Sequence, residues 1–166
     1  MPQPQMIASD EPPASSRSCV TAPLPRVDSL AALGLRVSRL FAQCRRQNAQ
    51  LAMLWVAVDL QMRPGESMDV DARDELIDAV SQRLRHRVRG VDEVLRVGEQ
   101  SFAVLLPSAG SLESDIVEQR LLQAVRGSYG MDERVVQLTV RVGRSLFPEH
   151  GRNGAELAEV ARRLAE

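Results

Sequence analysis

The 166-residue chain contains no lysine, so all 21 of its basic residues are arginine. This absence excludes a Walker-type phosphate loop, a Schiff-base lysine and a lysine general base. Aromatic residues make up only 3% of the chain, so the hydrophobic core must be built from aliphatic side chains. A Cys/His zinc site would need both His and both Cys residues, drawn from distant segments, and we expect no metal site.

Long apolar runs are also missing. No segment approaches the ~18 apolar residues that a membrane-spanning helix needs, and the N-terminus lacks the apolar core of a secretory signal. Two cysteines without a pattern, Cys19 and Cys44, fit a reducing compartment, so we expect a cytoplasmic location without membrane association. A net charge of −1 gives no reason to expect bulk nucleic-acid binding.

Proline is concentrated at one end of the chain. Residues 1–26 hold six of the nine prolines, mixed with Ser, Gln and Ala. Such a segment buries too little apolar surface to offset its ordering entropy, so we predict a flexible tail. The remaining residues, 27–166, are enough for one domain with a core of its own.

Hydrophobic periodicity within residues 27–166 predicts both helices and strands. One helix begins after Asp28 or Ser29, and further helices are expected over 72–88, 111–126 and 154–165. Strands are expected over 51–60, 91–97, 102–106 and 136–142. The order from residue 51 predicts an α/β (α+β) fold with a ferredoxin-like β-α-β-β-α-β core, whose mostly antiparallel sheet is flanked by helices and preceded by the N-terminal helix. In that topology the end of the first strand lies beside the turn at 98–101.

The predicted hairpin carries a specific resemblance. Residues 96–107, RVGEQSFAVLLP, resemble the signature hairpin of GGDEF domains, the diguanylate cyclase family, which reads R-[LY]-G-G-[DE]-E-F and ends in Pro. Residues 138–151 are similar to the family's later strand with its Pro and Gly, and residues 28–36 to its opening DxLTGLPNR motif. Several separated motifs in the right order, spanning 28–165, carry more weight than one motif alone.

The resemblance implies that most of the family's catalytic groups are replaced. Active members place a Mg²⁺-binding Asp at the end of the first strand, and counting back from residues 73–76, RDEL, which match the family's GDEL, that position is Ala57. Asp59 matches the family's second Asp, whereas Met62 stands at its Lys and Gly65 at its guanine-reading Asn.

The hairpin shows the same kind of change. Gly98 and Phe102 match the family pattern, but Glu99 replaces the second Gly, and Gln100 and Ser101 replace the acidic pair. Mg²⁺ requires hard anionic oxygens, and phosphoryl transfer with two metal ions requires carboxylates on both sides of the triphosphate. We therefore expect a degenerate GGDEF domain that has no catalytic residues, no cofactor and no enzymatic activity.

A second family feature is present. Arg89 and Asp92 form an RxxD whose Asp lies six residues before Gly98, the spacing of the family's inhibitory site for the product, cyclic di-GMP. A guanidinium binds phosphate or the guanine Hoogsteen edge, and a carboxylate accepts from guanine N–H groups. Arg120 falls near a further phosphate-binding Arg of some members. The resemblance thus implies a cyclic di-GMP receptor.

Two other interpretations of these residues stay open. Arg and Asp three residues apart at a helix end often form a local ion pair, and the arginine-rich run at 83–89 is typical of a solvated helix face rather than of a nucleic-acid site. The fold would then serve as an interaction scaffold that binds no nucleotide, with a homodimer or another signalling protein as its partner.

Overall fold

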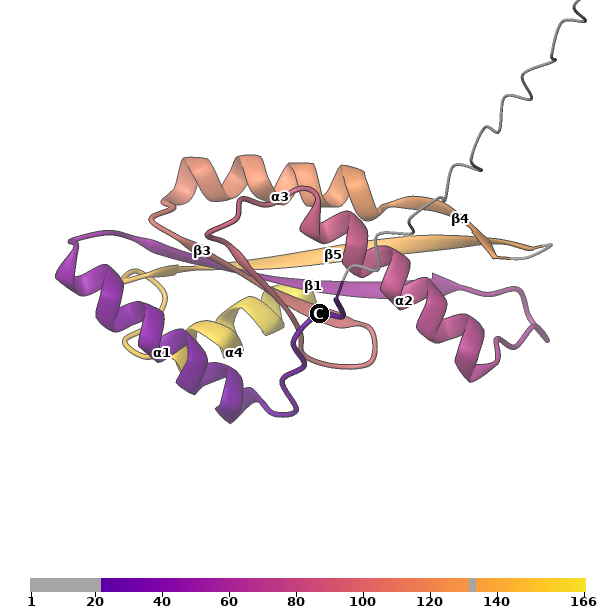
Figure 1. Ribbon diagram of the computed structural model, residues 1–166, viewed down its shortest axis with the longest axis horizontal. Coiled ribbons are helices and arrows are strands. Elements are labelled where there is room, and N and C mark those ends of the chain that lie inside the picture. The colour runs from indigo at the N-terminus through magenta and orange to yellow at the C-terminus, as the bar shows by residue number, and fades with distance from the viewer. Residues whose placement is uncertain (1–21, 132–133) are drawn as a thin grey trace, which may run out of the picture.

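The computed structural model describes residues 22–131 and 134–166. These residues form four helices and five strands (Figure 1). In chain order they are α1 (Leu30–Arg46), β1 (Leu51–Gln61), α2 (Val70–Arg85), β2 (Glu93–Arg96), β3 (Ser101–Pro107), α3 (Ser111–Val125), β4 (Gly127–Met131), β5 (Arg134–Phe147) and α4 (Gly154–Ala165).

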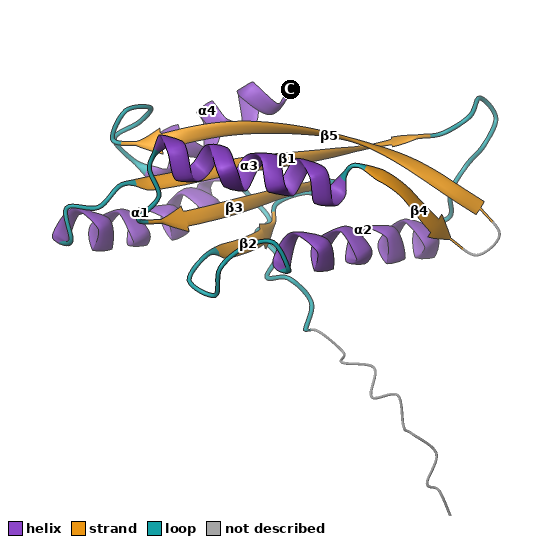
Figure 2. Ribbon diagram, turned by 90° about the horizontal axis from the view of Figure 1, so that it is seen from above, coloured by secondary structure: helices purple, strands orange, loops and turns teal. Residues whose placement is uncertain are grey.

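The five strands form one sheet in the order β2-β3-β1-β5-β4, with every neighbouring pair antiparallel. Helices α2 and α3 cover one face of this sheet, and α1 and α4 cover the other (Figures 1 and 2). The predicted fold class is therefore confirmed, including the antiparallel pairing of the first strand with the third.

Strand β1 lies at the centre of the sheet because both of its faces are apolar. Ala52, Leu54 and Val56 pack into the core under α2 and α3, while Met53 and Trp55 pack into the core under α1 and α4. Successive side chains of a strand point to opposite faces, so a nearly continuous apolar run can fill two cores.

The C-terminal part of the sheet differs from the prediction. Strand β4 was not expected, because three of its five residues are Gly or Ser, which have little preference for strands. Strand β5 is longer at both ends than the predicted 136–142. Tyr129 secures β4: its side chain is buried, its hydroxyl donates to the Val125 carbonyl at 2.8 Å, and the Arg83 guanidinium lies 3.9 Å from its ring centroid. The hydrogen bonds to β5 therefore hold β4 in a strand conformation that its residues do not favour by themselves.

Helix α2 also has different bounds from the predicted 72–88. It begins at Val70, because the Asp69 side chain caps it by accepting from the Ala72 N–H at 2.8 Å, and it ends at Arg85. Ser29 is the N-cap of α1, one of the two residues expected there.

Of the predicted tail, residues 1–21 lie outside the described residues, and the boundary after residue 26 stays a prediction. The described part contacts the domain. Pro25 accepts from the Arg96 N–H at 2.9 Å, and the Val27 N–H donates to the Arg96 carbonyl at 2.8 Å. Arg85 donates to the carbonyls of Ala22 and Pro23. The segment therefore covers the outer edge of β2.

Across residues 22–131 and 134–166, no helix is long and apolar enough to span a bilayer. Within the same ranges, no three His, Cys, Asp or Glu side chains gather closely enough to hold a metal ion.

Candidate functional site

The end of β1 and the β2–β3 turn meet, as the predicted topology requires. Ala57 pairs with Ser101 of β3 on one side and with Arg141 of β5 on the other. The Val58 N–H donates to the Gln100 carbonyl at 2.9 Å. The residues that stand at the family's metal-binding and hairpin positions therefore lie together, where the C-terminal part of β1 meets the β2–β3 turn.

The turn between β2 and β3 is held from inside by Arg96. Its guanidinium donates to the carbonyls of Gly98 and Glu99, each at 3.2 Å, and lies 3.7 Å from the Asp74 carboxylate. Phe102, the next family match, has no exposed surface and belongs to the core under α2 and α3. The predicted hairpin residues thus keep a defined turn, in which Glu99 is exposed to solvent.

A surface hollow of about 380 Å³ opens beside this turn. Its lining residues come from the end of β1, the following loop, the start of α2 and the turn: Asp59, Leu60, Met62, Glu66, Ser67, Met68, Arg73 and Gln100. Asp59, Met62 and Gln100, singled out from sequence motifs, therefore share one hollow.

The charges in and around the hollow are partly neutralised. The Asp59 carboxylate accepts from Arg141 Nε at 3.0 Å and lies 2.9 Å from Arg141 Nη2.

Arg73 Nε is buried and, among the described residues, has no hydrogen-bond partner. Arg73 stands where the family's GDEL has its Gly, which was a usable sequence signal. Arg141 had no such signal, because only the β1–β5 register brings it beside Asp59.

Arg89 and Asp92 form a local ion pair after α2. Asp92 Oδ2 accepts from the Arg89 backbone N–H at 2.8 Å and from its Nε at 3.3 Å, and Oδ1 accepts from Nη2 at 3.2 Å. The Asp92 side chain has no exposed surface, whereas the Arg89 side chain is 53% exposed. In this arrangement Asp92 contacts Arg89 and is not placed to accept from a ligand.

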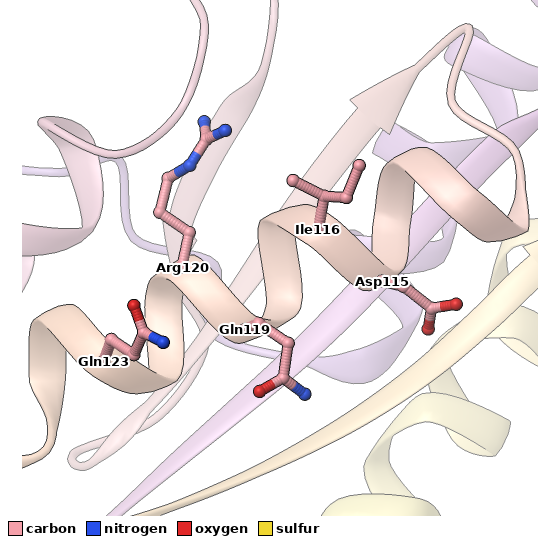
Figure 3. A pocket seen from close by; sticks show the side chains of 5 residues that line it. All are labelled: Asp115, Ile116, Gln119, Arg120 and Gln123. Carbon is pink, nitrogen blue, oxygen red and sulfur yellow. The ribbon is translucent and has the colours of Figure 1, made fainter.

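Arg120 joins this region from α3. Its Nη1 donates to the Arg87 carbonyl at 3.3 Å, so the helix reaches the loop that carries Arg87 and Arg89. All three arginines are exposed, and among the described residues neither Arg87 nor Arg120 has an ion-pair partner. We call Arg87, Arg89 and Arg120 the arginine surface. Arg120 also lines a hollow of about 440 Å³ on the outer face of α3 (Figure 3).

The run at 83–89 was predicted as a solvated helix face, and Arg83, Arg87 and Arg89 are indeed exposed. The helix ends at Arg85, however, so Arg87 and Arg89 lie in the loop after α2. Arg83 stacks on Tyr129, and Arg85 binds the carbonyls of the N-terminal segment. These two arginines therefore have packing roles that their spacing did not reveal.

Known proteins resemble this chain in sequence and in fold. Cyclic di-GMP phosphodiesterase NbdA of Pseudomonas aeruginosa is 33% identical over 144 residues, which cover 83% of this chain and 18% of NbdA. The solved GGDEF domain of TpbB from P. aeruginosa superposes with a TM-score of 0.73 and 24% identity, covering 84% of this chain and 86% of that one. P. aeruginosa diguanylate cyclase SiaD, solved in complex with its activator SiaC, gives a TM-score of 0.69 and 19% identity, covering 83% of this chain and 55% of SiaD.

The matches to curated proteins are to parts of longer chains. This chain spans 18% of NbdA and 28% of diguanylate cyclase TpbB. The family model described as "Diguanylate cyclase, GGDEF domain" matches residues 23–165, which is most of the sequence. Together with the five-stranded antiparallel sheet and its four helices, this match shows that the chain belongs to the GGDEF family.

Proposed function

We propose that this GGDEF domain has no cyclase activity and acts in cyclic di-GMP signalling as a receptor that binds the nucleotide at the arginine surface. The observation that carries the first part is the side-chain chemistry where β1 meets the β2–β3 turn. Ala57 and Ser101 are direct neighbours there, so a methyl group and a hydroxyl stand where the family needs carboxylates.

The residues present do not fit a pair of Mg²⁺ ions. Such ions take hard oxygen ligands in a near-octahedral shell, and phosphoryl transfer uses them to bridge the triphosphate. Gln100 is neutral, and the remaining carboxylate at the end of β1, Asp59, has the Arg141 guanidinium at 2.9 Å. We therefore derive no metal-dependent step for this domain.

Two replaced side chains further disfavour a triphosphate in the hollow, Glu99 by its negative charge and Arg73 by the space that it fills. Glu99 adds a negative charge at the turn, in place of the glycine that lets backbone approach phosphate closely. Arg73 places a long side chain in the hollow at a position where the family has no side chain. Both changes act on substrate binding, independently of the missing metal ligands.

The arginine surface supports the receptor role. Cyclic di-GMP carries two phosphates, and exposed guanidinium groups bind phosphate through paired, charge-assisted hydrogen bonds. Arg89 and Arg120 reach this surface from two different elements, and Asp92 fixes the orientation of Arg89 through bonds to its Nε and Nη2. In this proposal Asp92 positions Arg89, while Arg87, Arg89 and Arg120 contact the ligand.

The second candidate function is an interaction scaffold that binds no nucleotide. It is favoured by two exposed apolar residues on α3, Leu112 and Ile116. SiaD was solved with a protein activator, so a protein partner is a reasonable alternative ligand for a related domain. Either function is proposed for the cytoplasm, in keeping with the unpatterned cysteines.

Calorimetric titration of the full chain with cyclic di-GMP tests the receptor role. We expect low-micromolar affinity, about −8 kcal/mol. Arg89→Ala and Arg120→Ala should each weaken binding about ten- to more than a hundred-fold, since a charge-assisted contact contributes roughly 1.5–3 kcal/mol. Arg39→Ala, an exposed arginine of α1 on the other face of the sheet, is the matched control and should bind normally.

Two results would contradict the receptor role. If no heat and no thermal shift appear at about 100 µM ligand, on the order of the weakest affinity useful to a receptor, the scaffold becomes the better description. If the protein binds but neither Arg89→Ala nor Arg120→Ala weakens the complex, the site lies elsewhere on the domain.

A further inference from the structure

The outer face of α3 carries a stripe of side chains that faces away from the sheet. Leu112 is 76% exposed and Ile116 is 59% exposed, and both are large apolar residues. Gln119 and Gln123 continue the stripe, so its members are spaced by four, three and four residues. This is the seam spacing of a two-stranded coiled coil, with Ile116 and Gln123 at a positions and Leu112 and Gln119 at d positions.

Charged residues of opposite sign flank this stripe. Asp115 precedes Ile116 in the g position, and Arg120 occupies the following e position. Figure 3 shows Asp115 and Gln119 on one side of the helix and Ile116 and Arg120 on the other. Asp115 is 53% exposed despite its ion pair with Arg144, and Arg120 has no ion-pair partner among the described residues. Arg120 is thus unpaired within the described ranges, and Asp115 keeps about half of its side-chain surface for a second contact beside Arg144.

We propose that this face binds a second copy of the chain, through parallel pairing of the two α3 helices about a two-fold axis. In a parallel two-stranded coiled coil, a g residue lies against the e residue five positions further along the other helix. Asp115 and the partner's Arg120 have this spacing, and the symmetry forms the contact twice. Ile at a and Leu at d are the residues that favour two parallel strands.

The seam residues, rather than the charges, select the parallel arrangement. A fully overlapping antiparallel pair would bring Arg120 near the partner's Glu113, which is also an opposite charge. Glu113 is engaged within its own helix, where its Oε2 accepts from the Gly110 N–H at 3.1 Å. Ile at a and Leu at d favour two parallel strands, and the parallel arrangement pairs each Asp115 with an opposite charge.

The same structure limits the strength of this dimer. The seam covers about two heptads, and its second half is amide rather than aliphatic, so the buried area falls below the roughly 1,200 Å² of standard stable interfaces. We expect a dissociation constant on the order of 100 µM.

This pairing does not depend on nucleotide binding, but it shares Arg120 with the arginine surface. The tests therefore use protein without nucleotide and leave Arg120 unchanged.

Sedimentation equilibrium measures the association directly. The full chain, loaded over about 20–500 µM, should pass from mostly monomer to mostly dimer. Ile116→Glu should weaken dimerisation at least about ten-fold, because it places two like charges in the seam. Leu164→Glu, at an apolar residue of α4 that is 63% exposed, is the matched control and should dimerise normally. A monomer at every concentration, or a dimer that Ile116→Glu leaves intact, would overturn the proposal.

Disulfide trapping tests the orientation. In a chain carrying Cys19→Ser, and with Cys44 buried, a single new cysteine is the accessible thiol. Leu112→Cys and Gln119→Cys, made separately, should each oxidise to a linked dimer, because every d residue of a parallel pair faces its own copy at disulfide distance. An antiparallel pair brings at most one of the two positions against itself. Gln82→Cys on exposed α2 surface is the control for random collision. Trapping at only one d position, or no more than at residue 82, would refute the parallel pairing.

Discussion

Replacing Asp92 by alanine is expected to destabilise the fold. The residue lies in the loop between α2 and β2, where the sequence alone would suggest an exposed side chain. Its side chain has no exposed surface and accepts three bonds from Arg89, one of them from the backbone N–H at 2.8 Å. That N–H loses its acceptor when the carboxylate is removed. The variant therefore separates a positioning role for Asp92 from a purely ligand-binding one.

The magnitude follows from the two kinds of contact. A side-chain acceptor on a backbone N–H resembles a helix cap, which contributes about 1 kcal/mol, and an ion pair with a half-exposed arginine contributes at most about 1 kcal/mol. Asp92→Ala should therefore lower the free energy of unfolding by about 1–2 kcal/mol. For a domain of this size, that corresponds to a fall in Tm of roughly 2–8 °C.

Arg89→Ala is the matched comparison. It removes the ion pair but keeps the backbone N–H on Asp92, and the shortened side chain exposes the carboxylate to water. We expect a loss of at most about 1 kcal/mol. Urea denaturation of the wild type, both single variants and the double variant measures the coupling between the two side chains. If Asp92→Ala has the Tm of the wild type, or if both single variants lose equal stability, the Asp92 carboxylate does not hold the Arg89 backbone N–H in the folded protein.

Two further predictions concern packing and pH. Gly143→Ala should destabilise the domain by at least about 2 kcal/mol in urea denaturation, because the added Cβ would overlap the α4 backbone at Ala161, whereas Gly90→Ala meets no neighbour and serves as the control. Hydrogen bonds from Arg162 and Arg163 lower the pKa of Glu159 below its ordinary 4.5. The stabilisation from Glu159 is therefore present at neutral pH and is lost as the pH falls through this lowered pKa. The difference in stability between wild type and Glu159→Gln should shrink over the same acid range, and a difference that grows in acid would contradict this.

Much of the fold was predictable because its signals are local. The apolar run of β1 and the strict alternation in β5 identify the central strands, and the antiparallel topology then places the end of β1 beside the turn. Strand β4 was not predictable, because Gly127 and Gly130 carry no strand preference. Its structure comes from pairing with β5 and from Tyr129, whose burial depends on contacts with α2 and α3.

The sequence was sufficient to name residues of the candidate site, but not to predict which side chains pair with its two carboxylates. Motif spacing identified Asp59, Gln100 and the RxxD pair. The partner of Asp59, Arg141, depends on strand register across 82 residues, and the burial of Asp92 depends on how the loop folds over Arg89. Such tertiary contacts leave no periodic trace in the sequence, so the roles of these carboxylates emerged only from the structure.

Turnover of GTP is the direct test of whether this domain is a cyclase. Purified chain incubated with GTP and Mg²⁺ or Mn²⁺ is analysed for cyclic di-GMP by chromatography, beside heat-inactivated protein and Asp59→Ala, which removes the carboxylate paired with Arg141. We expect the same background in all three samples, since Ala57, Gln100 and Ser101 supply no metal-binding carboxylate. Product above background in the wild type that Asp59→Ala abolishes would contradict this expectation, because the chain would then be a working cyclase.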